Sequence, residues 1–450
     1  MSPRPSRALG ALVSLVALFT AGYLAPYLLP TVVGRLSAGL GLGPAQAGLV
    51  GSILLLGSAS AGFALAARVD RIGPRRAARL GLLLMLLGYG TAAASDTVPL
   101  VVAGAIVGGF GSGTATAVAA AGIAGRPDPH RAASLGLLSV SAAAGALYLT
   151  LPHLGGGHAL PFAAIAGAAV LVAPLTAWLP DASAIRDLTV APAATPAPSP
   201  LPHARPGAVL AGTLFLWSMA QNALWGVSGR IGLTQAGLTE VALGLVFAVA
   251  LGAGLVGVIG AGALGARLGR AVPIGVGTVL IAGCVLLSSA AEDATAFATG
   301  EIAWNAVYPV VLSYLLGLAA SLDPRGRWAV LVGSASSLGV ACGPLTGSLL
   351  SEAVGYPGMG VTLCALLLLV AAPMTAVARH TSGRPLVPGT TRRRGGAPTA
   401  LLASTTAPLL SPIPDLGAPE QPIAPVTLGR AARLRMTRSS FRLARGGGRQ

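Results

Sequence analysis

A single acidic residue inside a long apolar stretch is the strongest candidate for chemistry in this sequence. Glu301 stands about seven residues into the apolar stretch 294–320. Three residues follow it on the same helical face, at i+3, i+4 and i+7: Trp304, Asn305 and Tyr308. An ionisable group within a membrane span is costly and marks a functional site by default. We therefore predict that Glu301 carries a proton; if the helix begins later, it is instead a solvated acid at the helix end.

A second polar and aromatic face lies in the stretch 207–229. Trp217, Gln221 and Trp225 are spaced i, i+4 and i+8, and Asn222 is adjacent to them. Earlier stretches add two more candidates for lining a cavity, Tyr23 and Thr114. Aromatic faces, amides and one carboxylate suit an amphipathic or cationic organic molecule, because ring faces and a counter-charge both attract a cation. The alternative is that these side chains pack or hydrogen-bond between helices.

The composition places most of the chain in a membrane. The 450 residues are 54% hydrophobic and 9% charged, whereas soluble domains carry roughly 25% charged residues. At about 20 apolar residues per bilayer crossing, the chain has room for about twelve spans. The apolar stretches are 8–29, 47–67, 77–95, 98–123, 132–151, 160–179, 207–229, 241–263, 272–291, 294–320, 328–351 and 360–377.

These stretches fall into two groups of six. We expect an N-terminal six-helix half over 1–180, a cytoplasmic Pro/Ala-rich linker over 181–206 and a C-terminal six-helix half over 207–378. Proline at the density of this linker favours extended, solvated chain over helix. The remainder, 379–450, is expected to be a disordered, basic cytoplasmic tail, because its apolar residues do not share one helical face.

The net charge of +16 does not indicate a nucleic-acid partner, because of where it lies. Twelve arginines follow Ala378, against only Asp415 and Glu420, and most others stand in short loops between apolar stretches. Basic loops remain on the cytoplasmic side of a membrane. The first outer loop has only Arg35. We therefore expect a multi-pass protein of a bacterial inner (plasma) membrane, with both termini cytoplasmic.

Two loops about 200 residues apart resemble each other, and each follows the second stretch of its group. The first loop contains Asp70, Arg71, Gly73, Arg75 and Arg76, and the second contains Gly269 and Arg270. The two glycines allow sharp turns between helices. A carboxylate such as that of Asp70 is stabilised near a helix N-terminus. Repetition of this kind is how many secondary transporters are built.

These loops, with Gly343 and Pro344 in the stretch 328–351, resemble the major facilitator superfamily over roughly residues 8–378. The resemblance implies an all-α membrane fold of twelve transmembrane helices in two pseudo-symmetric six-helix halves, with a cavity lined by helices 1, 4, 7 and 10. It also implies that the loops are a conformational latch, although the arginines could serve topology alone. Gly343 and Pro344 would form a helix hinge. Ala105 stands where many proton-coupled exporters of the family have an arginine, so their coupling chemistry is not carried over.

The leading hypothesis is a secondary active transporter that moves a small organic molecule by alternating access, coupled to protons and directed outward. The alternatives are an uptake permease, and a sensor or scaffold that kept the fold without transport. The sequence lacks HExxH, GxSxG and Walker motifs, so we expect no enzyme. No metal site or cofactor is expected. The expected partners are the substrate, protons and the lipid bilayer, and the protein is expected to be a monomer.

Overall fold

The described part of the chain is helical and contains no β-strand. The computed structural model describes residues 5–66, 72–179, 201–265, 268–323 and 325–382. In lipid, a helix satisfies every backbone hydrogen bond within its own segment, which suits the long apolar stretches. The all-α membrane fold is therefore confirmed. Most of the predicted linker and nearly all of the predicted tail lie outside the described residues, so both remain predictions.

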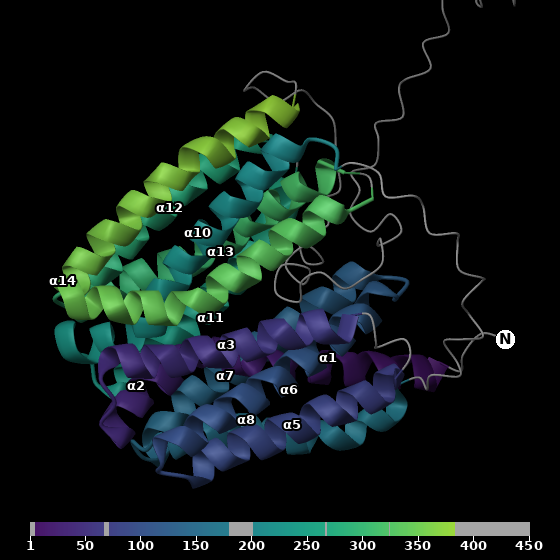
Figure 1. The fold of residues 1–450 in the computed structure, drawn as a ribbon, viewed down its shortest axis with the longest axis vertical. Coiled ribbons are helices and arrows are strands. Elements are labelled where there is room, and N and C mark those ends of the chain that lie inside the picture. Colours follow the sequence, from purple (N-terminus) through teal and green to yellow (C-terminus); the bar gives the residue numbers. More distant parts are fainter. Residues whose placement is uncertain (1–4, 67–71, 180–200, 266–267, 324, 383–450) are drawn as a thin grey trace, which may run out of the picture. The chain divides into compact units, whose positions relative to one another are not determined.

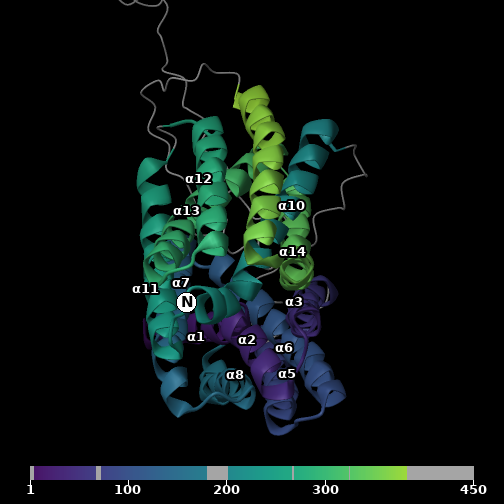
Figure 2. The ribbon, with the colours of Figure 1, turned by 90° about the vertical axis from the view of Figure 1, so that its left-hand side faces the viewer.

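Two groups of helices pack mainly among themselves (Figures 1 and 2). The first group comprises α1 (Pro5–Tyr27), α2 (Leu29–Leu40), α3 (Pro44–Ala66), α5 (Pro74–Ala94), α6 (Val98–Ala124), α7 (Pro129–Leu154), α8 (Ala159–Val172) and the 3₁₀ turn η1 (Ala173–Trp178). The second comprises α10 (Ala204–Arg230), the π turn η2 (Ile231–Gln235), α11 (Glu240–Leu264), α12 (Ala271–Ala290), α13 (Ala294–Ser321) and α14 (Arg327–Ser382). The helix α10 begins at Ala204, within the predicted linker over 181–206, and the division into halves over 1–180 and 207–378 remains a prediction.

The number of spans is consistent with twelve. Ten segments of the described chain are long and apolar enough to cross a membrane. One of them, α14, contains non-helical backbone at Gly355, where φ is 71°, so its 56 residues form two helices. The helix α10 is not among the ten, although its 27 residues are long enough to span a bilayer. Its polar residues, which include Gln221 and Asn222, lower its hydropathy.

The first helix extends further than the sequence indicated. Pro26 lies within α1, and α2 continues the chain from Leu29 to Leu40 after one non-helical residue. Arg35 is therefore a buried residue of a helix rather than part of an outer loop. The carbonyl of Pro26 has no i+4 amide donor, because residue 30 is also a proline and has no N–H. This free carbonyl becomes important at the site.

Glycines allow α14 to approach α10 closely. A Cβ at Gly343 would lie 2.5 Å from the Cβ of Asn222, and one at Gly347 would lie 2.1 Å from the carbonyl oxygen of Ala223. Small residues of this kind let two helix backbones pack in contact. The backbone is helical through Gly343 and Pro344, and the break in α14 lies at Gly355 instead. The hinge at these two residues remains a prediction.

The repeated loops turn at their glycines, as expected from their type. Gly73 has a φ of 86° and Gly269 a φ of 66°, and α5 and α12 begin just after them. Arg75 donates to the carbonyl oxygens of Ala177 (2.7 Å) and Leu179 (2.8 Å). These bonds join α5 to the end of η1, and both elements belong to the first group of helices.

The remaining latch residues are placed only in part. Arg270 donates to the hydroxyl of Ser321 at 2.5 Å, again within one group of helices. Arg76 is exposed. Asp70 and Arg71 lie outside the described residues. These hydrogen bonds of Arg75 and Arg270 join neighbouring elements of the same group, and a latch between the groups remains a prediction.

Candidate functional site

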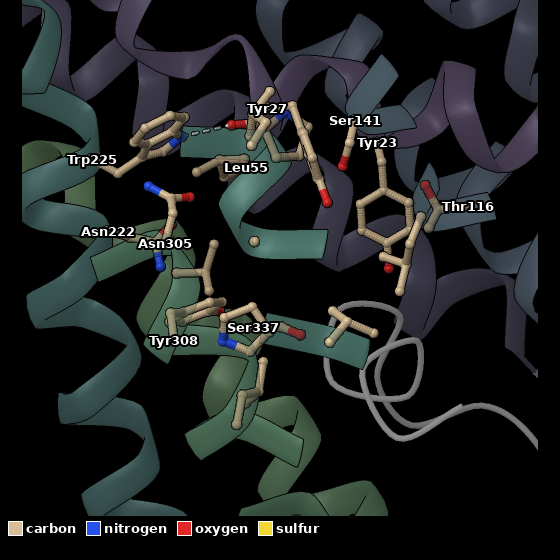
Figure 3. A pocket seen from close by; sticks show the side chains of 18 of the residues that line it. Tyr23, Tyr27, Leu55, Thr116, Ser141, Asn222, Trp225, Asn305, Tyr308 and Ser337 are labelled. Carbon is tan, nitrogen blue, oxygen red and sulfur yellow. Dashed lines mark hydrogen bonds between the residues drawn. The ribbon is translucent and has the colours of Figure 1, made fainter. Parts of the chain in front are cut away.

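A cavity of about 220 Å³ lies between the two groups of helices (Figure 3). This is smaller than the ~300–1,000 Å³ of typical ligand pockets, so it fits a small molecule. None of the residues that line it is charged. The side chains labelled in Figure 3 point into it from α1, α3, α6 and α7 on one side and from α10, α13 and α14 on the other.

The wall from α10 and α13 is aromatic and amide-rich, as the sequence predicted. Five of the predicted cavity residues line it: Asn222, Trp225, Trp304, Asn305 and Tyr308. The rings of Trp225 and Trp304 are 5.7 Å apart, and those of Trp304 and Tyr308 are 6.1 Å apart. Tilted rings at these separations pack favourably. Together they form a rigid surface that a flat apolar group can contact.

The opposite wall contains an unsatisfied hydroxyl. Tyr23 lines the cavity, as predicted, and its buried Oη has no hydrogen-bond partner among the described residues. A buried polar atom normally has a partner, so this hydroxyl is available to a molecule in the cavity. Tyr27, Thr116 and Ser141 complete the polar part of this wall.

Three predicted cavity residues do not line the cavity. Trp217 is fully buried and stacks on Tyr308, with the ring centroids 5.3 Å apart. Gln221 is also fully buried and accepts a hydrogen bond from Trp304 Nε1 at 2.8 Å. Thr114 packs against Gly81 of α5, on a face of α6 other than that of Thr116. Residues two positions apart are separated by about 200° around a helix, which explains why Thr114 and Thr116 lie on different faces.

Glu301 is fully buried behind the cavity wall rather than in it. Its Oε1 accepts a hydrogen bond from Ser228 Oγ at 2.8 Å, whereas Oε2 has no hydrogen-bond partner in the described chain. Ser288 Oγ of α12 is likewise buried without a hydrogen-bond partner among the described residues. The expectation that Glu301 supplies a counter-charge to a molecule in the cavity is therefore wrong. The alternative of a solvated acid at the helix end is also wrong.

The two groups of helices meet at one end, which we call the closed end. Four contacts join them there: Trp225 Nε1 to Pro26 O (3.1 Å), Leu345 N to Ser52 Oγ (3.0 Å), Ala45 N to Glu352 Oε1 (2.9 Å), and the ion pair of Arg35 with Glu240 (3.0 Å). The first uses the carbonyl that Pro30 leaves without a donor. A cavity wall residue is thus bonded directly to the opposite group.

Sequence reasoning missed several residues of the closed end. Arg230, at the end of α10, is buried and donates to Ser348 Oγ at 2.9 Å. His158 is also buried, with Nε2 3.0 Å from the carbonyl oxygen of Ser95. Glu352 attracted no attention because it follows an apolar stretch. For Arg35, the signal in the sequence is the apolar run that continues to Leu36.

The described residues contain no group of three or more His, Cys, Asp or Glu side chains that could hold a metal ion.

Comparison with known proteins identifies the architecture. The family model described as Major Facilitator Superfamily matches residues 8–324. A D-xylose–proton symporter structure matches with a TM-score of 0.67 and 15% identity over 83% of this chain and 98% of that one. The human organic anion transporter MFSD10 matches with a TM-score of 0.59 and 18% identity, over 83% of this chain and 100% of that one. No curated protein sequence matches this chain.

Proposed function

Because the chain belongs to the major facilitator superfamily, we propose that its transport activity carries a small amphipathic organic cation across the membrane in exchange for protons. Membrane transport follows from the family. The substrate class, the coupling to protons and the direction are our proposal. The observation that carries it is the uncharged aromatic cavity between the two groups of helices, with the carboxyl of Glu301 buried behind one wall.

The lining of the cavity supports an organic cation. Trp225, Trp304 and Tyr308 present aromatic rings, and a desolvated cation over such a face gains about 2 kcal/mol or more. The amides of Asn222 and Asn305 and the free hydroxyl of Tyr23 add hydrogen-bonding groups. No arginine lines the cavity, so it offers neither repulsion to a cation nor an ion-pair partner to an anion.

Burial supports the role of Glu301 as the proton carrier. A charged carboxylate in an apolar interior is strongly disfavoured unless it is paired. The Glu301 carboxyl accepts a hydrogen bond from the hydroxyl of Ser228, a neutral group that does not balance a negative charge. An exchangeable proton relieves this cost, and protonation would also let Oε2 take part as a hydroxyl donor. Binding and release of that proton would then accompany movement of the two helix groups.

We propose export as the direction of transport and a bacterial inner membrane as the location. We also propose that the two helix groups divide at the linker over 181–206. We propose that both termini are cytoplasmic, because arginine-rich loops are retained on the cytoplasmic side of a membrane. The latch role of Asp70, Arg71 and Arg76 is retained in the proposal. An uptake permease and a sensor without transport are distinguished by flux measurements.

The test of the substrate class uses phenyltrimethylammonium, a small aromatic cation that crosses lipid poorly on its own. Purified full-length protein in proteoliposomes should accumulate the radiolabelled cation when the lumen is acidic, and collapse of the pH gradient should abolish accumulation. Replacing both Trp225 and Tyr308 with leucine should reduce the flux about tenfold or more, because the ring faces are lost. Absence of flux with the wild-type protein would contradict the cation class and favour the sensor.

Coupling is tested with Glu301→Gln, which preserves the shape of the side chain and removes the titrating group. The variant should still exchange phenyltrimethylammonium at equal concentrations on both sides, but should not accumulate it against a gradient. The matched control is Glu292→Gln, which changes an exposed acid just before the same helix. Uphill accumulation by Glu301→Gln at the wild-type level would show that another group carries the proton.

A further inference from the structure

Helices α10 and α13 are joined by three side-chain contacts at successive levels, which we call the α10–α13 seam. Ser228 donates to Glu301 at 2.8 Å, Trp304 donates to Gln221 at 2.8 Å, and Trp217 stacks on Tyr308 at 5.3 Å. Residue numbers fall along α10 as they rise along α13. The two helices therefore run antiparallel, and the seam follows one face of each.

The seam separates the cavity from a buried layer behind it. Trp304 and Tyr308 line the cavity, whereas their partners Gln221 and Trp217 are fully buried and do not. In the remaining contact of the seam, neither Ser228 nor Glu301 lines the cavity. A molecule in the cavity thus touches the α13 rings but not the residues that hold them.

Gln221 is the polar anchor of this layer. Its Oε1 accepts the indole proton of Trp304, and its Nε2 donates to the carbonyl oxygen of Trp217 at 3.4 Å. An indole has a single N–H donor and, when buried, requires an acceptor. The orientation of the Trp304 ring is therefore fixed by this one bond together with its packing on Trp225 and Tyr308.

We propose that Gln221 is a positioning residue that sets the affinity of the cavity through Trp304 without touching the transported molecule. This deepens the proposed function and rests on it for the identity of the molecule. The same seam contains the Ser228–Glu301 bond two turns further along α10.

The first measurement reads the position of Trp304 directly and needs no transported molecule. The full chain is labelled with 5-fluorotryptophan, and the ¹⁹F resonance of Trp304 is assigned by its loss in Trp304→Phe. Gln221→Leu should shift that resonance and leave those of Trp178 and Trp328 in place. The matched control, Ser218→Ala, removes a buried hydrogen bond from α10 to Ser336 outside the seam, and should leave Trp304 unshifted.

The second measurement separates affinity from coupling. For phenyltrimethylammonium, Gln221→Leu should raise KM about tenfold, as expected for loss of one buried hydrogen bond, while the ratio of protons to cations stays unchanged. In the Trp304→Phe background, which lacks the indole N–H, Gln221→Leu should cause no further rise. If the role of Gln221 were purely structural, Gln221→Leu would still raise KM in that background.

Each outcome decides one claim. An unshifted Trp304 resonance in Gln221→Leu, or an equal rise in KM in the Trp304→Phe background, would overturn the positioning role. If the resonance shifts but the wild-type protein carries no phenyltrimethylammonium, the positioning of Trp304 by Gln221 stands while the proposed substrate class fails.

Discussion

At the scale of single residues, a buried carboxyl stabilises one of the connections between helices. Asp323, in the short connection between α13 and α14, is buried and accepts hydrogen bonds from Arg327 Nε at 2.6 Å and from the amide of Arg325 at 3.1 Å. Burial opposes ionisation of Asp323, but these hydrogen bonds outweigh it and hold the pKa of its carboxyl below the usual range. The charged form of Asp323 thus stabilises the connection between α13 and α14.

Replacing Asp323 with Asn tests this bond. Because the folded pKa lies below the unfolded value of about 3.9, the contribution of Asp323 is complete above that value and is lost as pH falls through the folded pKa. Asp323→Asn should therefore lower the thermal midpoint at pH 7, and the difference from wild type should shrink in acid. Glu292→Gln, at an exposed acid, is the control. A difference that is constant with pH would contradict this prediction.

Residue types identified the aromatic wall but not the orientation of every side chain. The i, i+3, i+4 and i+7 spacing correctly placed Trp304, Asn305 and Tyr308 on one face of α13. That face is broad, so a residue at its edge can point away from the cavity. Glu301 stands at that edge and points to Ser228. The sequence could not show which of Thr114 and Thr116 faces the cavity, because this depends on how α6 packs against α5. Periodicity within one helix holds no information on the neighbouring helix.

At the scale of elements, the apolar runs were sufficient to predict the helices. Gly355 lies in the interval between the last two predicted stretches, and its positive φ breaks α14 there. The extension of the first helix to Leu40 was not predicted, because hydropathy reports the membrane-embedded part of a helix and not its end. Contacts between helices, such as that of Gly347 with Ala223, depend on tertiary packing and were also beyond the sequence.

Packing of α14 on α10 gives a prediction at this scale. In Gly347→Ala the new methyl group would lie 2.1 Å from the carbonyl oxygen of Ala223, so the helices must move apart at a cost of about 1–3 kcal/mol. Scanning fluorimetry in detergent should show a lower thermal midpoint. Gly283→Ala is the control, since nothing lies within 4 Å of its Cβ position. Equal midpoints for the two variants would show that the helices accommodate the methyl group without loss of stability.

At the scale of the whole described unit, the ion pair of Arg35 with Glu240 joins the two groups of helices at the closed end. Arg35 is buried, and it also donates to the carbonyl oxygen of Leu151 within its own group. Glu240 is 45% exposed at its side chain, so solvent screens the pair and reduces its contribution to the order of 1 kcal/mol. That amount is enough to bias an equilibrium between two arrangements of the groups.

Glu240→Gln should therefore increase the population that is open at this end about fivefold, for a pair worth about 1 kcal/mol. Spin labels on the exposed positions 96 and 292, in a chain whose three native cysteines are replaced, report the distance between the groups by double electron–electron resonance. The fraction at long distance should rise. A label pair at 96 and 156, both in the first group, should not change. An unaltered distribution for 96 and 292 would exclude a role of the ion pair in closure.

The glycines of the closed end have a consequence for the energy supply of the cell. Cβ atoms at Gly48, Gly229 and Gly244 would lie 2.3 Å, 2.8 Å and 2.2 Å from Ser348, Pro30 and Tyr148 of the opposite group. Contact this close leaves no room for a chain of water molecules, and such a chain would conduct protons. We therefore expect the closed end to act as a seal against leakage. A larger side chain at any of these glycines would hold the two groups of helices apart, and the path opened in this way would let protons leak down the membrane gradient.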